Sequence, residues 1–191
     1  MKQKKIAINI PNILTITRIL LIPLFIIFLL KDMFHFALLV FTIAAISDGL
    51  DGLFARYLDQ RTLLGAYLDP LADKLLLTSA FIVLAVIKMV PGWLAVIVIS
   101  RDILILLGVV VFAMADISIE IRPRITSKCT TVFQMLTIFF LLLDPKIPGA
   151  DMIKSILYWL TAGLTILSGL HYTYIGMNLI QNASVNNRRN T

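Results

Sequence analysis

Residues 47–74 read SDGLDGLFARYLDQRTLLGAYLDPLADK and, besides Asp59 in the middle, place four carboxylates in two closely spaced pairs within a stretch that is otherwise mostly apolar. They belong to Asp48, Asp51, Asp69 and Asp73. An ionised carboxylate at membrane depth costs roughly 2.5 to 3.5 kcal/mol on insertion scales, so such a set needs a compensating cation or a water-filled cavity. Whether these residues form a functional site therefore depends on whether the surrounding chain lies in a membrane.

The composition is that of a membrane protein. Of the 191 residues, 59% are hydrophobic and 15% are charged, whereas about 25% are charged in average soluble domains. The mean hydropathy is +0.93. A spanning helix needs about 20 mostly apolar residues, so the chain can hold about six spans with short connections. These values exclude an ordinary soluble domain and predict one membrane domain over residues 1–183, followed by a disordered polar tail at 184–191.

Apolar runs bounded by Pro, Gly and charged residues predict six helices. They are expected at residues 13–30, 34–57, 63–88, 93–115, 125–143 and 153–180. The basic N-terminal segment lacks a small-residue cleavage site, so it is expected to remain as a short juxtamembrane segment. The fold class is therefore predicted to be all-α, an integral membrane bundle of six transmembrane helices.

The basic residues predict the orientation of this bundle. Ten Lys or Arg lie in or beside the N-terminal segment, the second and fourth connections and the tail, whereas four lie on the opposite side. Cytoplasmic loops collect Lys and Arg, so both termini are expected to be cytoplasmic, in a multi-pass protein of the cell inner membrane. Topology thus accounts for the net charge of +6 without a nucleic-acid partner. Three basic residues fall inside the spans and are candidates for function, namely Arg18, Lys74 and Arg101.

The four carboxylates are expected to meet at one depth. Asp48 and Asp51 are three residues apart, and Asp69 and Asp73 are four apart, so each pair lies on one helix face. The short connection at residues 58–62 makes the two helices antiparallel neighbours. The carboxylates should therefore come together just below the cytoplasmic surface.

A hard divalent cation removes the repulsion among these carboxylates. Mg²⁺, Mn²⁺ and Ca²⁺ prefer oxygen ligands, and the stretch contains no His or Cys that would favour zinc or copper. The single Cys129 can form neither an internal disulfide nor a metal cluster. Two ions about 3.5 to 4 Å apart would suit displacement at phosphorus. We therefore expect Mg²⁺ or Mn²⁺, in a two-metal site.

Small residues leave space beside the carboxylates. Gly52, Ala55 and Gly65 would let a substrate or a helix backbone approach closely. Arg56 lies near the water boundary, where a guanidinium can bind phosphate oxygens in bidentate fashion. Taken singly, each residue has another interpretation, because small residues also serve helix packing and a boundary Arg also anchors topology.

The joint pattern resembles the signature of the CDP-alcohol phosphatidyltransferases, integral membrane enzymes of phospholipid synthesis. Every fixed position of that signature is filled here, by Asp48, Asp51, Gly52, Ala55, Arg56, Gly65, Asp69 and Asp73. Size and the six expected spans also agree, so the resemblance covers essentially the whole chain. It implies transfer of a phosphatidyl group from CDP-diacylglycerol to an alcohol with release of CMP, and it implies a homodimer.

The resemblance also implies roles for individual residues. Asp48, Asp51 and Asp69 would hold the metal pair, while Asp73 would bind metal and act as general base on the acceptor hydroxyl. Positions similar to those that hold the CDP-lipid are occupied by Gly52, Ala55, Arg56, Thr62 and Gly65. Asn12 and Thr15 are expected to line the same nucleotide pocket.

The acceptor alcohol depends on residues outside the signature. Arg101 and Lys128 could bind a phosphate on the acceptor, because a buried Arg is costly unless it meets an anion. The alternatives are an internal ion pair of Arg101, either with Asp102 or with the carboxylate cluster, and a topology role for Lys128.

Two branches of the family match different segments. The opening IPNILTITRILLIP and the PLADK segment resemble the branch that makes phosphatidylglycerophosphate from glycerol 3-phosphate, and we expect this acceptor. The segments ISRD and S-K-x-T-T are closer to the branch that makes cardiolipin with phosphatidylglycerol as acceptor. Outside the family, intramembrane carboxylates also serve ion or proton transport. A transport path would need acidic partners in the other half of the bundle, where the sequence offers no second carboxylate cluster at mid-depth, and a structural membrane protein would not need this spacing.

Overall fold

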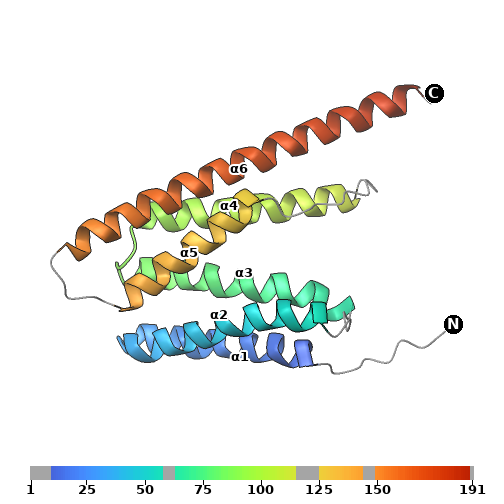
Figure 1. Cartoon of the computed structure of the whole chain (residues 1–191). Coiled ribbons are helices and arrows are strands. Elements are labelled where there is room, and N and C mark those ends of the chain that lie inside the picture. Colours follow the sequence, from blue (N-terminus) through green and yellow to red (C-terminus); the bar gives the residue numbers. More distant parts are fainter. Residues whose placement is uncertain (1–9, 58–62, 115–124, 144–148, 190–191) are drawn as a thin grey trace. The chain divides into compact units, whose positions relative to one another are not determined.

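A computed structural model describes residues 10–57, 63–114, 125–143 and 149–189 (Figure 1). These residues form six helices, which are α1 (Ile10–Leu30), α2 (Phe34–Tyr57), α3 (Leu63–Val86), α4 (Gly92–Met114), α5 (Ile125–Leu143) and α6 (Ala150–Arg189). No strand occurs in these ranges. The prediction of an all-α fold with six helices is confirmed.

The predicted helix bounds differ from the observed ones mainly at α1 and α6. α2 and α5 have the predicted ends. α1 begins at Ile10, earlier than predicted, because Pro11 falls in its first turn, where a missing N–H costs no helical hydrogen bond. α6 continues to Arg189, well past the predicted end at residue 180 and into the segment expected as a polar tail.

The described helices belong to two compact units. Unit 1 contains α1, α2, α3 and the end of α5 from Ile138, and unit 2 contains α4, α5 up to Thr137, and α6. The helices that carry the four carboxylates therefore lie in unit 1, whereas Arg101 and Lys128 lie in unit 2.

In unit 1, α1 packs against both α2 and α3. The buried residues of α1 repeat every three or four positions, as one helix face requires; they are Thr15, Arg18, Ile22, Phe25 and Leu29. The rings of Phe25 and Phe41, on α1 and α2, lie 5.8 Å apart. One face of α1 thus fixes the two helices on which the carboxylates lie.

α1 and α3 end in the same type of cap. After α1, Met33 N donates to the carbonyl oxygen of Phe28 at 2.9 Å, and Asp32 N donates to that of Leu29 at 3.1 Å. This pair of bonds is a Schellman motif, and the equivalent pair closes α3 around Lys88. The motif needs one residue in the left-handed region, and φ is 56° at Asp32 and 62° at Lys88. Glycine usually occupies this position, since other residues pay roughly 1–2 kcal/mol there.

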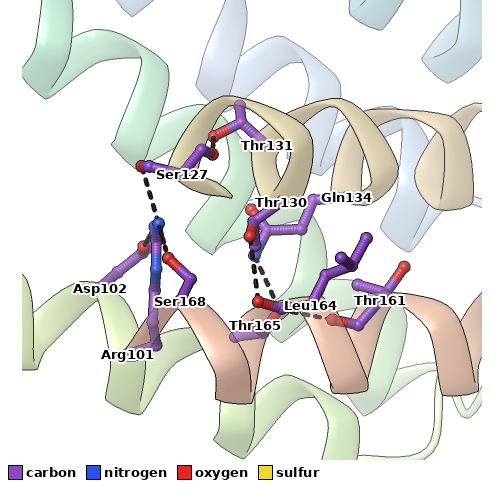
Figure 2. Close-up of polar contacts among 10 residues, drawn as sticks. All are labelled: Arg101, Asp102, Ser127, Thr130, Thr131, Gln134, Thr161, Leu164, Thr165 and Ser168. Atoms are coloured by element: carbon purple, nitrogen blue, oxygen red, sulfur yellow. Dashed lines mark hydrogen bonds and ion pairs between the residues drawn. The ribbon is translucent and has the colours of Figure 1, made fainter. Parts of the chain in front are cut away.

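Unit 2 has a polar interior and apolar outer faces. Hydroxyl and amide side chains fill the contact between α5 and α6 (Figure 2), and the fully buried ones are Thr130, Gln134, Thr137, Thr161, Thr165 and Ser168. The exposed residues of the same two helices include Val132, Leu136, Ile166, Leu167 and Leu170. Helix pairs in lipid associate through interhelical hydrogen bonds and close packing, so this distribution is the one expected in a bilayer.

An aromatic pair connects the beginning of α4 with α6. The rings of Trp93 and Trp159 lie 5.3 Å apart with an interplanar angle of 36°. They are 42% and 71% exposed. These are the two tryptophans of the chain, so both belong to unit 2.

Among the described residues, one helical stretch is long and apolar enough to cross a membrane by length and composition, Ala150–Met177. Four shorter apolar stretches accompany it, at Thr15–Leu30, Phe34–Ser47, Lys74–Val86 and Ser127–Leu143. The six helices are therefore established, while six membrane crossings and two cytoplasmic termini stay predictions.

The cap of α3 generates a prediction about stability. We expect Lys88→Gly to stabilise the protein by roughly 1 kcal/mol, because glycine adopts positive φ without a Cβ clash. This should raise the thermal unfolding midpoint in detergent by about 2–4 °C. Ala85→Gly, inside the last turn of α3, is the matched control and should lower the midpoint, since glycine costs about 1 kcal/mol in a helix. A midpoint that falls in both variants would contradict the strain at Lys88.

Candidate functional site

The four carboxylates lie on neighbouring segments of the chain that the structure describes as helix. Asp48 and Asp51 are on α2, and Asp69 and Asp73 are on α3. Their side chains lie outside the described part of the structure, so their places follow from the backbone and the helical register.

Asp48 and Asp73 are in helical register with buried residues of α2 and α3. Asp48 follows the buried Ala44 by four residues, and Asp73 precedes the buried Leu77 by four. Residues at this spacing occupy the same helix face. The aspartates therefore occupy positions that prolong the packed faces of unit 1 toward the connection between α2 and α3.

Helix length sets the level of each carboxylate. The short connections make α1, α2 and α3 run in alternating directions, with the end of α1, the start of α2 and the end of α3 at one end of unit 1 (Figure 1). At 1.5 Å per residue, Asp48 and Asp73 lie about 20 Å from that end, and Asp51 and Asp69 lie about 26 Å from it. Each aspartate of α2 thus has a counterpart on α3 at nearly the same level.

α1 brings polar residues to these levels. Counted from its end at Leu30, Arg18 lies at about 18 Å, Thr15 at about 23 Å and Asn12 at about 27 Å. Thr15 and Arg18 are fully buried on the face that packs in unit 1, while the side chain of Asn12 lies outside the described part. The levels agree with the predicted nucleotide pocket, and contact of Asn12 and Thr15 with a nucleotide stays a prediction.

Arg18 was named as a candidate for function but was given no role in the predicted site. Its sequence signal was a charge within an apolar run, and the structure adds that this charge is buried at the level of the carboxylates.

The donor set fits a hard divalent cation. Carboxylate oxygens are ligands that Mg²⁺ and Mn²⁺ accept, and no His or Cys lies in residues 47–74. Elsewhere in the described part of the chain, no three His, Cys, Asp or Glu side chains gather in a way that could hold a metal ion.

The remaining signature residues lie near the carboxylates on the same two helices. Gly52, Ala55 and Arg56 lie in the last two turns of α2, and Gly65 lies in the first turn of α3. Thr62 falls outside the described residues. These positions are closer to the connection between α2 and α3 than the carboxylates are.

Arg101 is the centre of a separate polar cluster in unit 2 (Figure 2). Its Nη1 donates to Asp102 Oδ1 at 2.7 Å, and its Nη2 donates to the hydroxyls of Ser127 and Ser168, both at 2.8 Å. The side chains of Arg101 and Asp102 are 3% and 9% exposed. The guanidinium on α4 therefore connects with α5 and α6 through one serine of each.

The structure realises one of the alternatives for Arg101, the ion pair with Asp102. Within the described residues, Arg101 Nε has no hydrogen-bond partner. Lys128 is exposed on α5 next to Ser127, and the described contacts do not bring it to Arg101. Binding of an acceptor phosphate by Arg101 and Lys128 stays a prediction.

The polar contact continues along α5 and α6. Thr130 Oγ1 donates to the carbonyl oxygen of Leu164 at 3.1 Å, and the hydroxyls of Thr137 and Thr161 lie 2.8 Å apart. Gln134 Nε2 lies 3.5 Å from Thr165 Oγ1. Hydroxyls and one amide thus define how these parts of α5 and α6 pack.

Comparison with known proteins places this arrangement in a family. The family model described as CDP-alcohol phosphatidyltransferase matches residues 8–167. The match contains all four aspartates, Thr15, Arg18, Arg101 and Lys128.

Individual relatives extend over most of the chain. This chain is 39% identical over 178 residues to the CDP-diacylglycerol--glycerol-3-phosphate 3-phosphatidyltransferase of Pseudomonas fluorescens. The aligned residues cover 86% of this chain and 88% of that protein. The protein of the same name in Bacillus subtilis (strain 168) is 31% identical over 86% of this chain and 93% of its own length. The cardiolipin synthase (CMP-forming) of Homo sapiens is 32% identical over 91% of this chain, which spans only 63% of the human protein.

The Arg101 cluster generates a second stability prediction. Asp102→Ala should destabilise unit 2 by about 3–5 kcal/mol, because it leaves a buried guanidinium without its anion. The double replacement Arg101→Met with Asp102→Leu should cost less than the sum of the two single replacements, since it removes both charges. Unfolding in detergent measures Asp102→Ala, Arg101→Met, Asp102→Leu and the double variant. Additive losses would show that Arg101 and Asp102 are not coupled.

Proposed function

Since the chain belongs to the CDP-alcohol phosphatidyltransferase family, we propose that it transfers the phosphatidyl group of CDP-diacylglycerol to an alcohol and releases CMP. One observation carries the proposal. Two aspartates on α2 and two on α3 lie at matching levels, beside the buried polar end of the α1 face that packs on both helices.

We propose sn-glycerol 3-phosphate as the acceptor, with phosphatidylglycerophosphate as the product. Two bacterial relatives carry the name of this activity, and the chain spans 88% and 93% of their lengths. Phosphatidylglycerol is the alternative acceptor, giving cardiolipin, because the human cardiolipin synthase aligns with 91% of this chain. Because the chain spans only 63% of the human cardiolipin synthase, compared with 88% and 93% of the two bacterial proteins, we prefer glycerol 3-phosphate as the acceptor.

A membrane location agrees with the distribution of side chains. Large apolar residues are exposed on all six helices, including Leu20 at 67%, Val86 at 68% and Leu167 at 63%. Soluble monomers rarely expose contiguous apolar patches of more than a few hundred Å². We propose that all six helices cross the cell inner membrane with both termini in the cytoplasm, which puts the carboxylates near the cytoplasmic surface. A homodimer is part of the same proposal.

In the proposed mechanism, Asp48, Asp51, Asp69 and Asp73 would hold Mg²⁺ or Mn²⁺. The bound cations would supply positive charge that neutralises the diphosphate and the CMP leaving group. Gly52, Ala55 and Gly65 leave room for the CDP moiety, and Arg56, Thr62, Asn12 and Thr15 orient it.

Asp73 is the proposed base. One of its oxygens takes the proton of the acceptor hydroxyl as the hydroxyl oxygen attacks the phosphorus that bears diacylglycerol. The bond from this phosphorus to the CMP oxygen breaks, and CMP leaves. Because metal ligation would lower the basicity of this carboxylate, the oxygen of Asp73 that takes the proton would be the one that does not hold metal. A positioned base contributes typically 10² to 10⁴ in rate.

An acceptor panel tests the reaction. Purified protein in detergent with Mg²⁺ or Mn²⁺ should release CMP from CDP-diacylglycerol when glycerol 3-phosphate is added. Phosphatidylglycerol, serine, inositol phosphate and choline should give little release. Release with phosphatidylglycerol alone would establish the cardiolipin alternative. No CMP with any acceptor, together with proton or cation flux in liposomes lacking CDP-lipid, would replace the transferase with a transporter.

Replacement of the base tests the assignment of Asp73. We expect Asp73→Asn to lower kcat by about 10² to 10⁴, because the amide cannot accept the proton. Asp32→Asn makes the same chemical change at the exposed cap of α1, at the opposite end from the connection between α2 and α3, and should keep full activity. Retained turnover in Asp73→Asn would move the base to another residue.

A further inference from the structure

Arg18 is a fully buried charge in unit 1. It lies on the face of α1 that packs against α2 and α3, between Thr15 and Ile22, and is 0% exposed. A guanidinium stays protonated in proteins. Its withdrawal from water is costly unless anions lie beside it. The burial of Arg18 therefore favours negative charge close to this part of α1.

The three packed helices offer few sources of that charge. α1 contains no acidic residue, and the acidic residues of α2 and α3 are the four signature aspartates. By helical rise, Arg18 lies about 18 Å from the capped end of unit 1, compared with about 21 Å for Asp48 and about 20 Å for Asp73. Asp51 and Asp69 lie about 8 Å farther along than Arg18. Asp48 and Asp73 are thus the aspartates at the level of Arg18.

The other basic residue at this level is Lys74. It is partly exposed, and it directly follows Asp73, so it is rotated by about 100° from the face that Asp73 occupies. Arg18 is the fully buried cation on the packed face.

We propose that Arg18 is a positioning residue of the carboxylate site, the fixed positive charge at the level of Asp48 and Asp73 that offsets part of the repulsion among the carboxylates while no divalent cation is bound. The proposal rests on the proposed metal-binding function of the four aspartates. Without a cation, four nearby carboxylates repel one another, and a permanent positive charge on the facing helix offsets part of that repulsion. When Mg²⁺ or Mn²⁺ binds, the metal charge takes over most of this compensation, so the protein depends less on Arg18.

The test compares thermal unfolding of substrate-free protein in detergent, in EDTA and in Mn²⁺. Arg18→Gln should lower the midpoint in EDTA by about 5–10 °C and recover most of the loss in Mn²⁺. Arg18→Lys keeps the charge and should stay close to wild type in both conditions. An equal loss in EDTA and in Mn²⁺, or no loss in either, would overturn the proposal.

Arg101→Gln is the matched control, because it removes another buried guanidinium, one that is paired with Asp102 in unit 2. Its midpoint should fall by the same amount in EDTA and in Mn²⁺. If Arg18→Gln does not fold, the double variant Arg18→Gln with Asp48→Asn tests the pairing instead. This variant removes one charge of each sign and should therefore fold in EDTA. A double variant no more stable in EDTA than Arg18→Gln would contradict the pairing.

The outcomes separate this proposal from the proposed function. CMP release by wild type, together with equal losses for Arg18→Gln in both conditions, would overturn the role of Arg18 alone. Absence of CMP release and of any Mn²⁺-induced shift in wild type would overturn the metal-dependent function. Under that outcome Arg18→Gln would lose stability equally in both conditions and the role of Arg18 in a metal site would fall as well, while recovery with Asp48→Asn would show only that Arg18 and Asp48 form an ion pair.

Discussion

The packing of one face of α1 against both α2 and α3 is the constraint on which the candidate site depends. Toward the C-terminal end of α1 that face is apolar, with Phe25 packed against Phe41, whereas toward the N-terminal end it carries Thr15 and Arg18. Apolar packing fixes the spacing and register of three helices, and the same register carries the polar residues and the aspartates to common levels. The candidate site therefore continues the apolar contact of the three helices. Apolar residues outside the proposed chemistry set the positions of its residues along the helices.

Most of the fold could be predicted because the ends of apolar runs coincide with turn residues. The limits of α2 and α5 follow directly from this rule. α1 and α6 show where it fails. Pro11 looked like a boundary although proline fits a first helical turn, and the polar end of α6 contains no glycine or proline between Met177 and Arg189 to stop the helix. Polarity alone was a poor guide to where a helix ends.

The candidate site was predictable where the signal was local. The aspartates stand out because charge within an apolar helix is costly, and their spacing is visible along the chain. The hydrogen-bond partners of Arg101 could be predicted from the sequence only in part. Asp102 is adjacent in sequence, whereas Ser127 and Ser168 lie 26 and 67 residues away, and single hydroxyls at such separations carry no pattern. Arg18 had the same difficulty, since the residues that explain its burial lie on other helices.

The pairing of Trp93 with Trp159 has a spectroscopic consequence. Both tryptophans of the chain belong to one stack, at the beginning of α4 and in the first half of α6. Emission excited at the red edge of tryptophan absorption therefore originates from a single place in unit 2. The wild-type chain carries its own reporter for the environment of that unit, while unit 1, with the carboxylates, is silent at this wavelength and needs an introduced tryptophan to be observed.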